Sequence, residues 1–356
     1  MKILIDIGHP AQVHYFRNFI NIMESKGHSC FVIARDKEVT FELLKNFNIK
    51  YKSRGKGGEG SLRKLLYIIK ADYLIYRFAR VIKPDLFLSF GSTYAGHVSF
   101  ILNKPHIVFD DSENATLERK LYKPFADSIL TPECYSIDLG RKQIKFSGFM
   151  ELCYLNPKYF KPNSEVSNLL GLKPEEKYVL LRFVSWNASH DVGQIGMSLD
   201  FKHKLIELLS KQWKVFISSE APLNVEFLKY KLVIPPYLIH DVLANAALFI
   251  GEGATMASEC AILGTPAIYT NSITNGYIAE HTQTGSIFRF KDSESVKKKA
   301  LQILNSPEIK EEFKKNSKKI LNEKIDVTAF MVWFIENYPQ SVEILKTNPD
   351  YQKSFK

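Results

Sequence analysis

Three carboxylic acids lie within four residues of the stretch FDDSENAT, at Asp110, Asp111 and Glu113. Negative charges this close together repel one another, and burial in a cleft disfavours their ionisation further, so at least one of the three is expected to have a raised pKa. A carboxyl group of that kind can act as a general acid or base. The same acids could instead stabilise the start of a helix over residues 112–121. The sequence favours catalysis or substrate binding at this loop.

The stretch GEGATMASECAILGTP, residues 251–266, reads as a strand end, a glycine turn and a helix. Gly251 and Gly253 permit a tight turn and the close approach of a ligand. If Thr255 is the N-cap, the acid of a capping box would fall on position 258, which is a serine. Glu259 comes one residue too late to cap the helix and is predicted to bind a hydroxyl group of a ligand. The N–H groups of the helix start favour a phosphate or diphosphate, and the residues predicted to hold it are Gly253, Ala254, Thr255 and Met256.

Polar and aromatic side chains also crowd the stretch RFVSWNASHDVGQ, residues 182–194, which follows a strand pattern. Arg182 is predicted to pair with a phosphate, and Trp186 to stack on a sugar or base. Ser185 and His190 are predicted to donate hydrogen bonds to the ligand. In the alternative, Arg182 pairs with a carboxylate and Trp186 fills a domain interface.

Strand and helix patterns alternate along both halves of the chain, which predicts parallel sheets covered by helices on both faces. Ligands of such sheets bind outside the carboxyl ends of the strands, so the site is expected in the loops that follow them. The predicted strands cover residues 2–7, 30–34, 85–90, 106–109, 128–130 and 144–148, and then 178–183, 213–218, 232–234, 248–251, 266–269 and 286–290.

A chain of 356 residues is too long for one small core, and its amino-acid composition changes near the middle. One α/β domain is predicted over residues 1–155 and a second over residues 176–326. Between them, residues 156–175 are rich in Pro, Asn, Ser and Lys and are predicted to form a linker. Residues 327–356 are predicted to add an apolar helix and a frayed polar tail. Two such domains joined by a linker place a cleft between their strand ends.

The net charge of +10 at pH 7 permits an anionic partner. Nucleic acid is not expected, because no helix-turn-helix, zinc-finger or aromatic-basic RNA signature is present. No run of about 18 uncharged apolar residues predicts a membrane-spanning helix. The N-terminus reaches Asp6 after three apolar residues and is predicted to be a strand, not a signal peptide. The four cysteines have no metal-site spacing and fit buried thiols in a reducing cytoplasm.

The pattern G-x-G-x-x-x-x-x-E followed by A-x-L-G-T-P-A resembles the C-terminal nucleotide-sugar site of GT-B-fold enzymes. These include the lipid-linked N-acetylglucosaminyltransferase of peptidoglycan synthesis and the non-hydrolysing UDP-N-acetylglucosamine 2-epimerases. The whole chain more closely resembles a poorly characterised domain-of-unknown-function family allied to this fold. That resemblance rests on the stretches DIGHPAQVHYF, SFGSTYAGH, FDDSENAT, LTPECY, LLRFVSWNASHDVGQ and GEGATMASE. It implies an α/β fold of two Rossmann-like domains in a GT-B arrangement with an interdomain cleft.

The resemblance also implies roles for single residues. Glu259 corresponds to the glutamate that binds ribose hydroxyls, and the segment from Tyr237 to Ile239 corresponds to one that contacts the nucleobase through backbone groups. His14 corresponds by position to a histidine near the acceptor, where it would take a proton from the attacking hydroxyl; it could equally pack the first helix turn. An aspartate of the epimerases corresponds to Ser92, which cannot carry out proton chemistry.

These features predict a cytoplasmic, nucleotide-sugar-dependent glycosyltransferase that acts in surface-polysaccharide or glycolipid assembly. Its expected substrates are a UDP-linked sugar and a glycan or lipid-linked acceptor, with no separate cofactor and no metal. The alternatives are a nucleotide-sugar 2-epimerase or hydrolase and a non-catalytic nucleotide-sugar-binding protein. The basic amphipathic helix pattern over residues 61–83 fits peripheral contact with an anionic membrane, and it fits a core helix with a solvated basic face as well.

Overall fold

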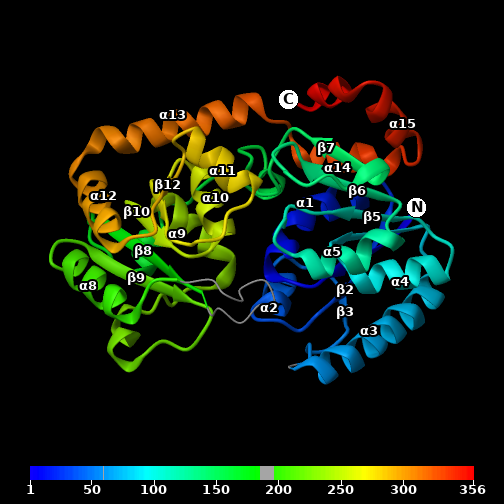
Figure 1. Cartoon of the computed structure of the whole chain (residues 1–356), viewed down its shortest axis with the longest axis horizontal. Helices are drawn as coiled ribbons and strands as arrows, with labels where there is room; N and C mark the ends of the chain where they lie inside the picture. The colour runs from blue at the N-terminus through cyan, green and yellow to red at the C-terminus, as the bar shows by residue number, and fades with distance from the viewer. Residues whose placement is uncertain (59, 185–195) are drawn as a thin grey trace. The chain divides into compact units, whose positions relative to one another are not determined.

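The computed structural model describes residues 1–58, 60–184 and 196–356 of the chain (Figure 1). These residues form two compact units. Unit 1 consists of Met1–Tyr154 and Ile325–Lys356, and unit 2 consists of Leu155–Lys324. Each unit is built on one parallel sheet with helices packed against it, as the alternation of strand and helix patterns predicts.

The sheet of unit 1 has seven strands in the order β3-β2-β1-β4-β5-β6-β7. They are β1 (Lys2–Ile7), β2 (Ser29–Ala34), β3 (Tyr51–Ser53), β4 (Leu86–Phe90), β5 (His106–Phe109), β6 (Ser128–Pro132) and β7 (Gln143–Phe146). β1 pairs with both β2 and β4, so the chain order reverses between β1 and β4. The loops after these two strands diverge at that point, which is where open α/β sheets bind ligands.

The helices of unit 1 include α1 (Pro10–Ser25), whose predicted apolar face is buried at Val13, Phe16, Phe19, Ile20 and Met23. The helix ends before Gly27, which has a φ of +85° that glycine adopts without Cβ strain. The helices are α1 (Pro10–Ser25), α2 (Thr40–Asn46), α3 (Ser61–Ile82), α4 (Thr93–Ile101), α5 (Thr116–Tyr122), α6 (Leu152–Leu155, at the boundary of the unit), α14 (Val327–Glu336) and α15 (Gln340–Thr347), with the 3-10 helices η1 (Lys123–Phe125), η2 (Gly140–Lys142) and η5 (Pro349–Phe355).

The sheet of unit 2 has five strands in the order β12-β11-β10-β8-β9. They are β8 (Tyr178–Phe183), β9 (Lys214–Ser219), β10 (Leu248–Gly251), β11 (Ala267–Tyr269) and β12 (Phe288–Arg289). β10 lies between β8 and β11, so the loop after it is surrounded by other loops. The helices are α7 (Val166–Leu169), α8 (Leu199–Ser210), α9 (Ile239–Asn245), α10 (Ala254–Leu263), α11 (Gly276–Gln283), α12 (Ser293–Asn305) and α13 (Pro307–Glu323), with the 3-10 helices η3 (Val225–Tyr230) and η4 (Pro236–Leu238).

Two strand assignments differ from the prediction. Residues 232–234 form no strand; an isolated bridge to Ile217 is made by the preceding residue, Lys231. Val233 is 78% exposed, and the two prolines that follow it cannot donate to a ladder. β3 was not predicted because it is a short edge strand whose side chains are mostly exposed, so it has no apolar pattern.

The C-terminal segment and the predicted linker both pack on a unit. In unit 1, the ring of Trp333 in α14 stacks on Tyr351 at 4.8 Å between centroids, and Phe330 contacts Phe355 at 5.8 Å. The tail is therefore packed as η5, and the prediction that it is frayed was wrong. In unit 2, the predicted linker contains α7, which packs on α9.

Candidate functional site

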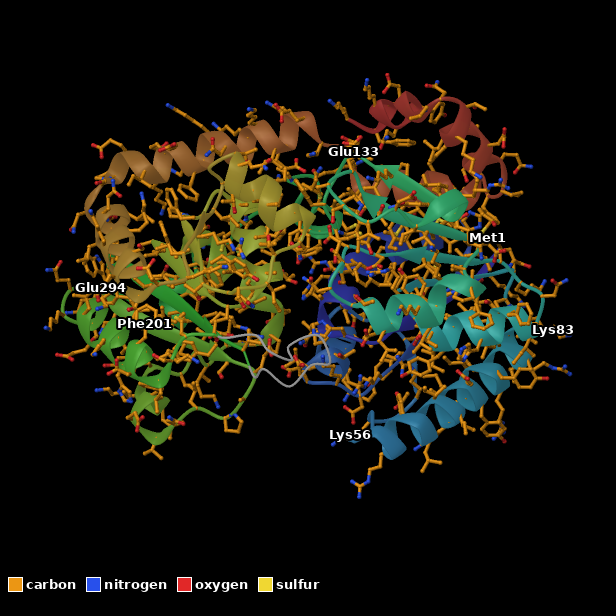
Figure 2. All side chains as sticks on the ribbon, viewed as in Figure 1. Met1, Lys56, Lys83, Glu133, Phe201 and Glu294 are labelled. Atoms are coloured by element: carbon orange, nitrogen blue, oxygen red, sulfur yellow. The ribbon has the colours of Figure 1, made fainter. Side chains whose placement is uncertain are left out.

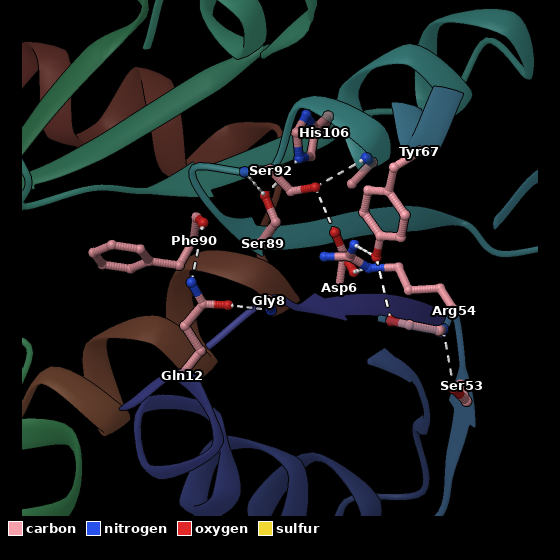
Figure 3. Close-up of polar contacts among 12 residues, drawn as sticks. Asp6, Gly8, Gln12, Ser53, Arg54, Tyr67, Ser89, Phe90, Ser92 and His106 are labelled. Atoms are coloured by element: carbon pink, nitrogen blue, oxygen red, sulfur yellow. Dashed lines mark hydrogen bonds and ion pairs between the residues drawn. The ribbon is translucent and has the colours of Figure 1, made fainter. Parts of the chain in front are cut away.

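Polar side chains at the carboxyl ends of β1, β3 and β4 form a buried network in unit 1 (Figure 3). Arg54 Nε donates to Asp6 Oδ1 at 2.8 Å, and both side chains are 2% exposed. Ser92 Oγ donates to the other carboxylate oxygen, Asp6 Oδ2. Arg54 also donates to the Tyr67 hydroxyl at 2.6 Å and lies 4.6 Å from the centroid of the Tyr94 ring. Asp6 is thus neutralised by Arg54 and supports the loops above it.

Ser92, the position of the epimerase acid, has a structural role. Its oxygen accepts a hydrogen bond from the Ala95 N–H group at 3.1 Å and so caps α4, while its hydrogen is donated to Asp6. The Ser89 hydroxyl accepts from the Ser92 N–H group and lies 2.8 Å from His106 Nε2. Burial lowers the pKa of His106 to about 3, so this imidazole is neutral at neutral pH. Ser92, Ser89 and His106 therefore bring no charge to this position, and the carboxylate that holds Ser92, Asp6, is paired with Arg54.

Asp110, the first of the three acids after β5, holds its own loop. Its Oδ2 accepts hydrogen bonds from the hydroxyl groups of Tyr122 and Tyr135. Its Oδ1 accepts from the Ser112 N–H group at 2.8 Å. The side chain is 3% exposed, and burial raises its pKa. With three hydrogen bonds inside the protein, Asp110 is the weakest of the three candidates for proton transfer.

Asp111 and Glu113 lie in different environments. Glu113 Oε1 accepts hydrogen bonds from the N–H group and the hydroxyl of Ser136 at 3.1 and 3.4 Å. The Asp111 carboxylate accepts a hydrogen bond from the Ser112 hydroxyl at 3.2 Å. Burial, and then the neighbouring charge of Asp110, raises the pKa of Asp111 to about 8. A carboxyl group that exchanges its proton near neutral pH suits general acid–base catalysis, so Asp111 is the best candidate in this loop.

The alternative in which these acids stabilise a helix start was wrong. α5 begins at Thr116, its N-cap is Ala115, and no side chain caps it. The acid in its first turn is Glu118. Residues 112–115 form a turn instead, closed by a hydrogen bond from the Ala115 N–H group to the Ser112 carbonyl at 3.0 Å. The three acids therefore belong to the loop after β5 and not to the helix.

His14 lies in α1, which follows β1. The helix is capped by His9, whose Nδ1 accepts from the Ala11 N–H group at 3.2 Å. His14 is 5% exposed, and its ring centroid lies 5.6 Å from that of Phe47 and 5.3 Å from that of Tyr154. This aromatic packing fits the structural alternative for His14 and holds its ring in one orientation. Its role as a base stays a prediction.

In unit 2, α10 begins two residues earlier than predicted. Its N-cap is Gly253 and not Thr255, and no side chain caps the helix. With this start, the acid of a capping box would fall on Met256, so Glu259 in the second turn still has no capping role. The first turn, which begins at Ala254, is partly exposed. Its N–H groups carry the positive end of the helix dipole and suit an anion.

Glu259 is buried and held by a residue of another helix. Its Oε1 lies 3.0 Å from Nε2 of His240, in the first turn of α9. Glu259 is 5% exposed and His240 is 1% exposed, and the imidazole packs edge-on against Phe160 at 6.1 Å. The carboxylate is therefore oriented before a ligand arrives, which lowers the entropic cost of binding a hydroxyl group.

Gly251 and Gly253 differ in the space around them. A Cβ atom on Gly251 would lie 2.5 Å from Cζ of Phe249 and 2.8 Å from Cβ of Arg182, whereas on Gly253 the nearest atom would be 3.7 Å away. We expect Gly251→Ala to lower the free energy of unfolding by about 2–3 kcal/mol, because a methyl group enters filled space. Gly253→Ala costs less than about 1 kcal/mol, the loss expected for alanine at an N-cap. Urea unfolding of both variants measures the difference, and equal losses would contradict this account of the turn.

Arg182, at the end of β8, already has an acidic partner. Its Nη1 donates to Ser218 Oγ at 2.7 Å and its Nη2 to Glu220 Oε1 at 2.8 Å. This ion pair is the alternative that the sequence left open. Because Glu220 partly neutralises Arg182, the start of α10 is the stronger positive feature of this turn. The other residues predicted in this loop lie outside the described residues: Ser185, Trp186 and His190.

The segment predicted to contact the nucleobase forms a short turn. Tyr237 lies in η4 and is 40% exposed, and Ile239 is the first residue of α9. A cavity of about 260 Å³ borders this turn. Leu238 and Asp241 line one side of it, and α7 with its flanking residues lines the other. The stretch predicted as a linker therefore forms one wall of a hollow beside the predicted nucleobase segment.

Glu252, between the two glycines, was not singled out from the sequence. Its carboxylate accepts hydrogen bonds from the N–H groups of Val184 and Met197 at 2.9 and 2.6 Å. Its backbone carbonyl accepts from Asn271 Nδ2 at 2.9 Å. Glu252 is 1% exposed and links the loops after β8, β10 and β11. The sequence feature that could have identified Glu252 is an acid between two glycines at the end of a strand. Asp6 has a similar feature, since it is an acid near the end of the apolar strand β1.

Within residues 1–58, 60–184 and 196–356, no group of three or more His, Cys, Asp or Glu side chains could hold a metal ion. None of the helices in these residues is long and apolar enough to cross a membrane.

The sequence matches the family described as "protein of unknown function (DUF354)" over residues 1–338. The chain belongs to this family. An uncharacterized protein of Methanocaldococcus jannaschii is 27% identical over 282 residues, which cover 75% of this chain and 81% of that protein. The resemblance stated from the sequence motifs is therefore confirmed at the level of the family.

Similar solved structures include UDP-GlcNAc 2-epimerases and a glycosyltransferase. The UDP-GlcNAc 2-epimerase from Neisseria meningitidis bound to UDP-GlcNAc has a TM-score of 0.70 at 15% identity, covering 94% of this chain and 99% of that one. The UDP-GlcNAc 2-epimerase of Methanocaldococcus jannaschii in complex with UDP-GlcNAc and UDP has a TM-score of 0.63 at 14% identity, covering 86% and 93%. The glycosyltransferase VinC in complex with dTDP has a TM-score of 0.59 at 12% identity, covering 96% and 100%. At these identities the likeness shows the fold alone, and it confirms the predicted pair of Rossmann-like domains of the GT-B type.

Proposed function

We propose that the protein is a glycosyltransferase of the GT-B type that uses a nucleotide sugar. One observation carries this proposal: the buried carboxylate of Glu259, held by His240, lies in the turn that follows the glycine-flanked start of α10. A nucleoside diphosphate presents hydroxyl groups and an anionic diphosphate, which suit this carboxylate and this helix start. The proteins of similar fold that are bound to UDP-GlcNAc, UDP or dTDP support the same ligand class.

In this proposal unit 2 holds the nucleotide. The N–H groups of residues 253–256 stabilise the charge that develops on the leaving diphosphate. Arg182 contributes less, because its guanidinium is shared with Glu220. Glu259 accepts hydrogen bonds from the ribose. The proposed donor is a UDP-linked sugar, and no further cofactor is part of the proposal.

Unit 1 supplies the base in this proposal. The acceptor hydroxyl loses its proton to Asp111 as its oxygen bonds to the anomeric carbon, and the bond from that carbon to the diphosphate breaks. Asp111 suits this step because burial and Asp110 raise its pKa to about 8. His14 is the second candidate. The proposed acceptor is a glycan or lipid-linked sugar of surface-polysaccharide or glycolipid assembly.

A 2-epimerase is the second candidate function, because the N. meningitidis epimerase has a TM-score of 0.70 over nearly the whole chain. The position of Ser92 favours transfer over epimerisation. Its hydroxyl is used by Ala95 and Asp6, and a serine cannot exchange a proton with a sugar carbon as an aspartate can.

One incubation separates these functions. The purified full chain is mixed with a panel of UDP-, dTDP- and GDP-linked sugars without acceptor, and products are followed by NMR and mass spectrometry. A transferase binds one donor and leaves it almost unchanged until an acceptor is added. A new sugar epimer would establish the epimerase instead, and rapid release of nucleotide would establish a hydrolase. Binding without turnover across a broad acceptor screen would favour the non-catalytic alternative.

A further inference from the structure

One side of α3 exposes large apolar side chains. Leu66, Ile69 and Tyr73 are 58%, 64% and 57% exposed, and their spacing of three and four residues places them on one helix face. Val81 near the end of the helix is 79% exposed. Burial of such side chains is favourable, so a face of this kind in contact with water indicates a binding surface.

The same helix is strongly basic. Residues 61–83 contain six lysines and arginines and a single acid, Asp72. Asp72 is partly buried and bound to His97 at 2.8 Å, so it faces the neighbouring helix α4. Figure 2 shows side chains along the outer side of α3, between the labelled Lys56 and Lys83. This part of the chain therefore combines exposed apolar groups with an excess of positive charge.

Helix α4 extends this surface. It packs beside α3 in unit 1 (Figure 1). Phe100 and Ile101 at its end are 71% and 64% exposed, and Lys104 follows them. The α3–α4 surface is defined here as two sets of side chains. The apolar set is Leu66, Ile69, Tyr73, Val81, Phe100 and Ile101, and the basic set is Arg63, Lys70, Arg77, Arg80, Lys83 and Lys104.

Helix α13 shows that positive charge alone does not make such a surface. It carries five lysines. Among the described residues of the chain, however, none of the exposed large apolar side chains belongs to α13. Two of its lysines also pair with acids of the same helix, Lys314 with Glu311 and Lys319 with Glu323. The combination of apolar and positive groups distinguishes α3 and α4 from this helix.

We propose that the α3–α4 surface docks the protein on an anionic lipid bilayer. The apolar side chains enter the boundary between headgroups and acyl chains, and the lysines and arginines bind the headgroup phosphates. A second copy of the chain fits less well, because a symmetric dimer would bring two positive surfaces together. The inference does not depend on the proposed function.

The test is co-sedimentation of the full chain with vesicles. We expect binding to vesicles of phosphatidylcholine mixed with phosphatidylglycerol, little binding to phosphatidylcholine alone, and loss of binding at high salt. We expect Arg77→Glu with Arg80→Glu to weaken binding about tenfold or more. The matched control is Lys315→Glu with Lys318→Glu on α13, which changes the net charge equally and leaves binding within about twofold.

A second pair of variants tests the apolar part. Ile69→Ser with Tyr73→Ser weakens binding about tenfold or more. Val225→Ser with Val233→Ser, at apolar positions of unit 2 that are even more exposed, leaves binding unchanged. All eight positions are exposed, and circular dichroism checks that each variant is folded. Equal effects of the α3 and control pairs would overturn the proposal. So would a wild-type dimer that Ile69→Ser with Tyr73→Ser converts to monomer, since a second copy would then be the partner.

Discussion

We expect Glu259→Ala to lower the affinity for UDP by about 100-fold, which corresponds to ~2.7 kcal/mol. A carboxylate that accepts hydrogen bonds from two ribose hydroxyls contributes this much because each bond involves a charged group. The carboxylate is already oriented by His240 at 3.0 Å, so little is lost in ordering it. Isothermal titration calorimetry with the full chain measures the change.

The control must separate ribose recognition from damage to the fold, because Glu259→Ala also removes the partner of a buried histidine. Comparison of UDP with 2′-deoxy-UDP does so: wild type prefers UDP by about tenfold, and Glu259→Ala binds both alike. Glu294→Ala, at an exposed acid of α12, keeps the wild-type preference. A wild-type protein that binds UDP and 2′-deoxy-UDP equally well would refute the ribose role of Glu259.

The second large effect concerns turnover. We expect Asp111→Asn to lower kcat by about 10²–10⁴-fold while the affinity for the nucleotide sugar changes little, because an amide cannot take a proton from the acceptor. In wild type, burial and the charge of Asp110 raise the pKa of Asp111 to about 8. The base must be ionised, so kcat rises with pH through that value. Unchanged turnover in Asp111→Asn would place the base elsewhere, with His14 tested next.

The same raised pKa predicts a change in stability that does not require a substrate. The folded protein keeps the Asp111 proton up to a pH of about 8, whereas the unfolded chain releases it near the ordinary value of 3.8. Between these values the folded state binds more protons, so the stability of the wild type falls as the pH rises. Asp111→Asn removes this loss. Thermal unfolding should show the variant gaining on the wild type from about pH 4 to about pH 8; a constant difference would contradict the raised pKa.

Local patterns predicted most of the framework. The buried strands β1, β5, β8 and β10 were read within one residue of their ends, because a strand covered on both faces is a short apolar run bounded by turn residues. The edge strand β3 has no such run. The start of α10 was misplaced because its N-cap is a glycine without a capping side chain, which leaves no mark in the sequence.

The site was harder to predict because its partners are distant in sequence. Arg54 and Asp6 are 48 residues apart, and Glu252 binds N–H groups 68 and 55 residues before it. No periodicity encodes such pairs. The types of the residues were enough to identify candidates such as Glu259 and Asp111. Only the packed structure distinguishes Asp110, which accepts hydrogen bonds from two tyrosines, from its neighbour Asp111.

Hydrogen–deuterium exchange with and without UDP tests most directly whether the nucleotide binds at the start of α10. A bound diphosphate would accept hydrogen bonds from the N–H groups of residues 253–256, and the ribose would stabilise the turn that contains Glu259. We expect slower exchange in peptides that cover residues 251–263, and unchanged exchange of α12 in the same unit. Saturating UDP that leaves residues 251–263 unprotected would contradict it.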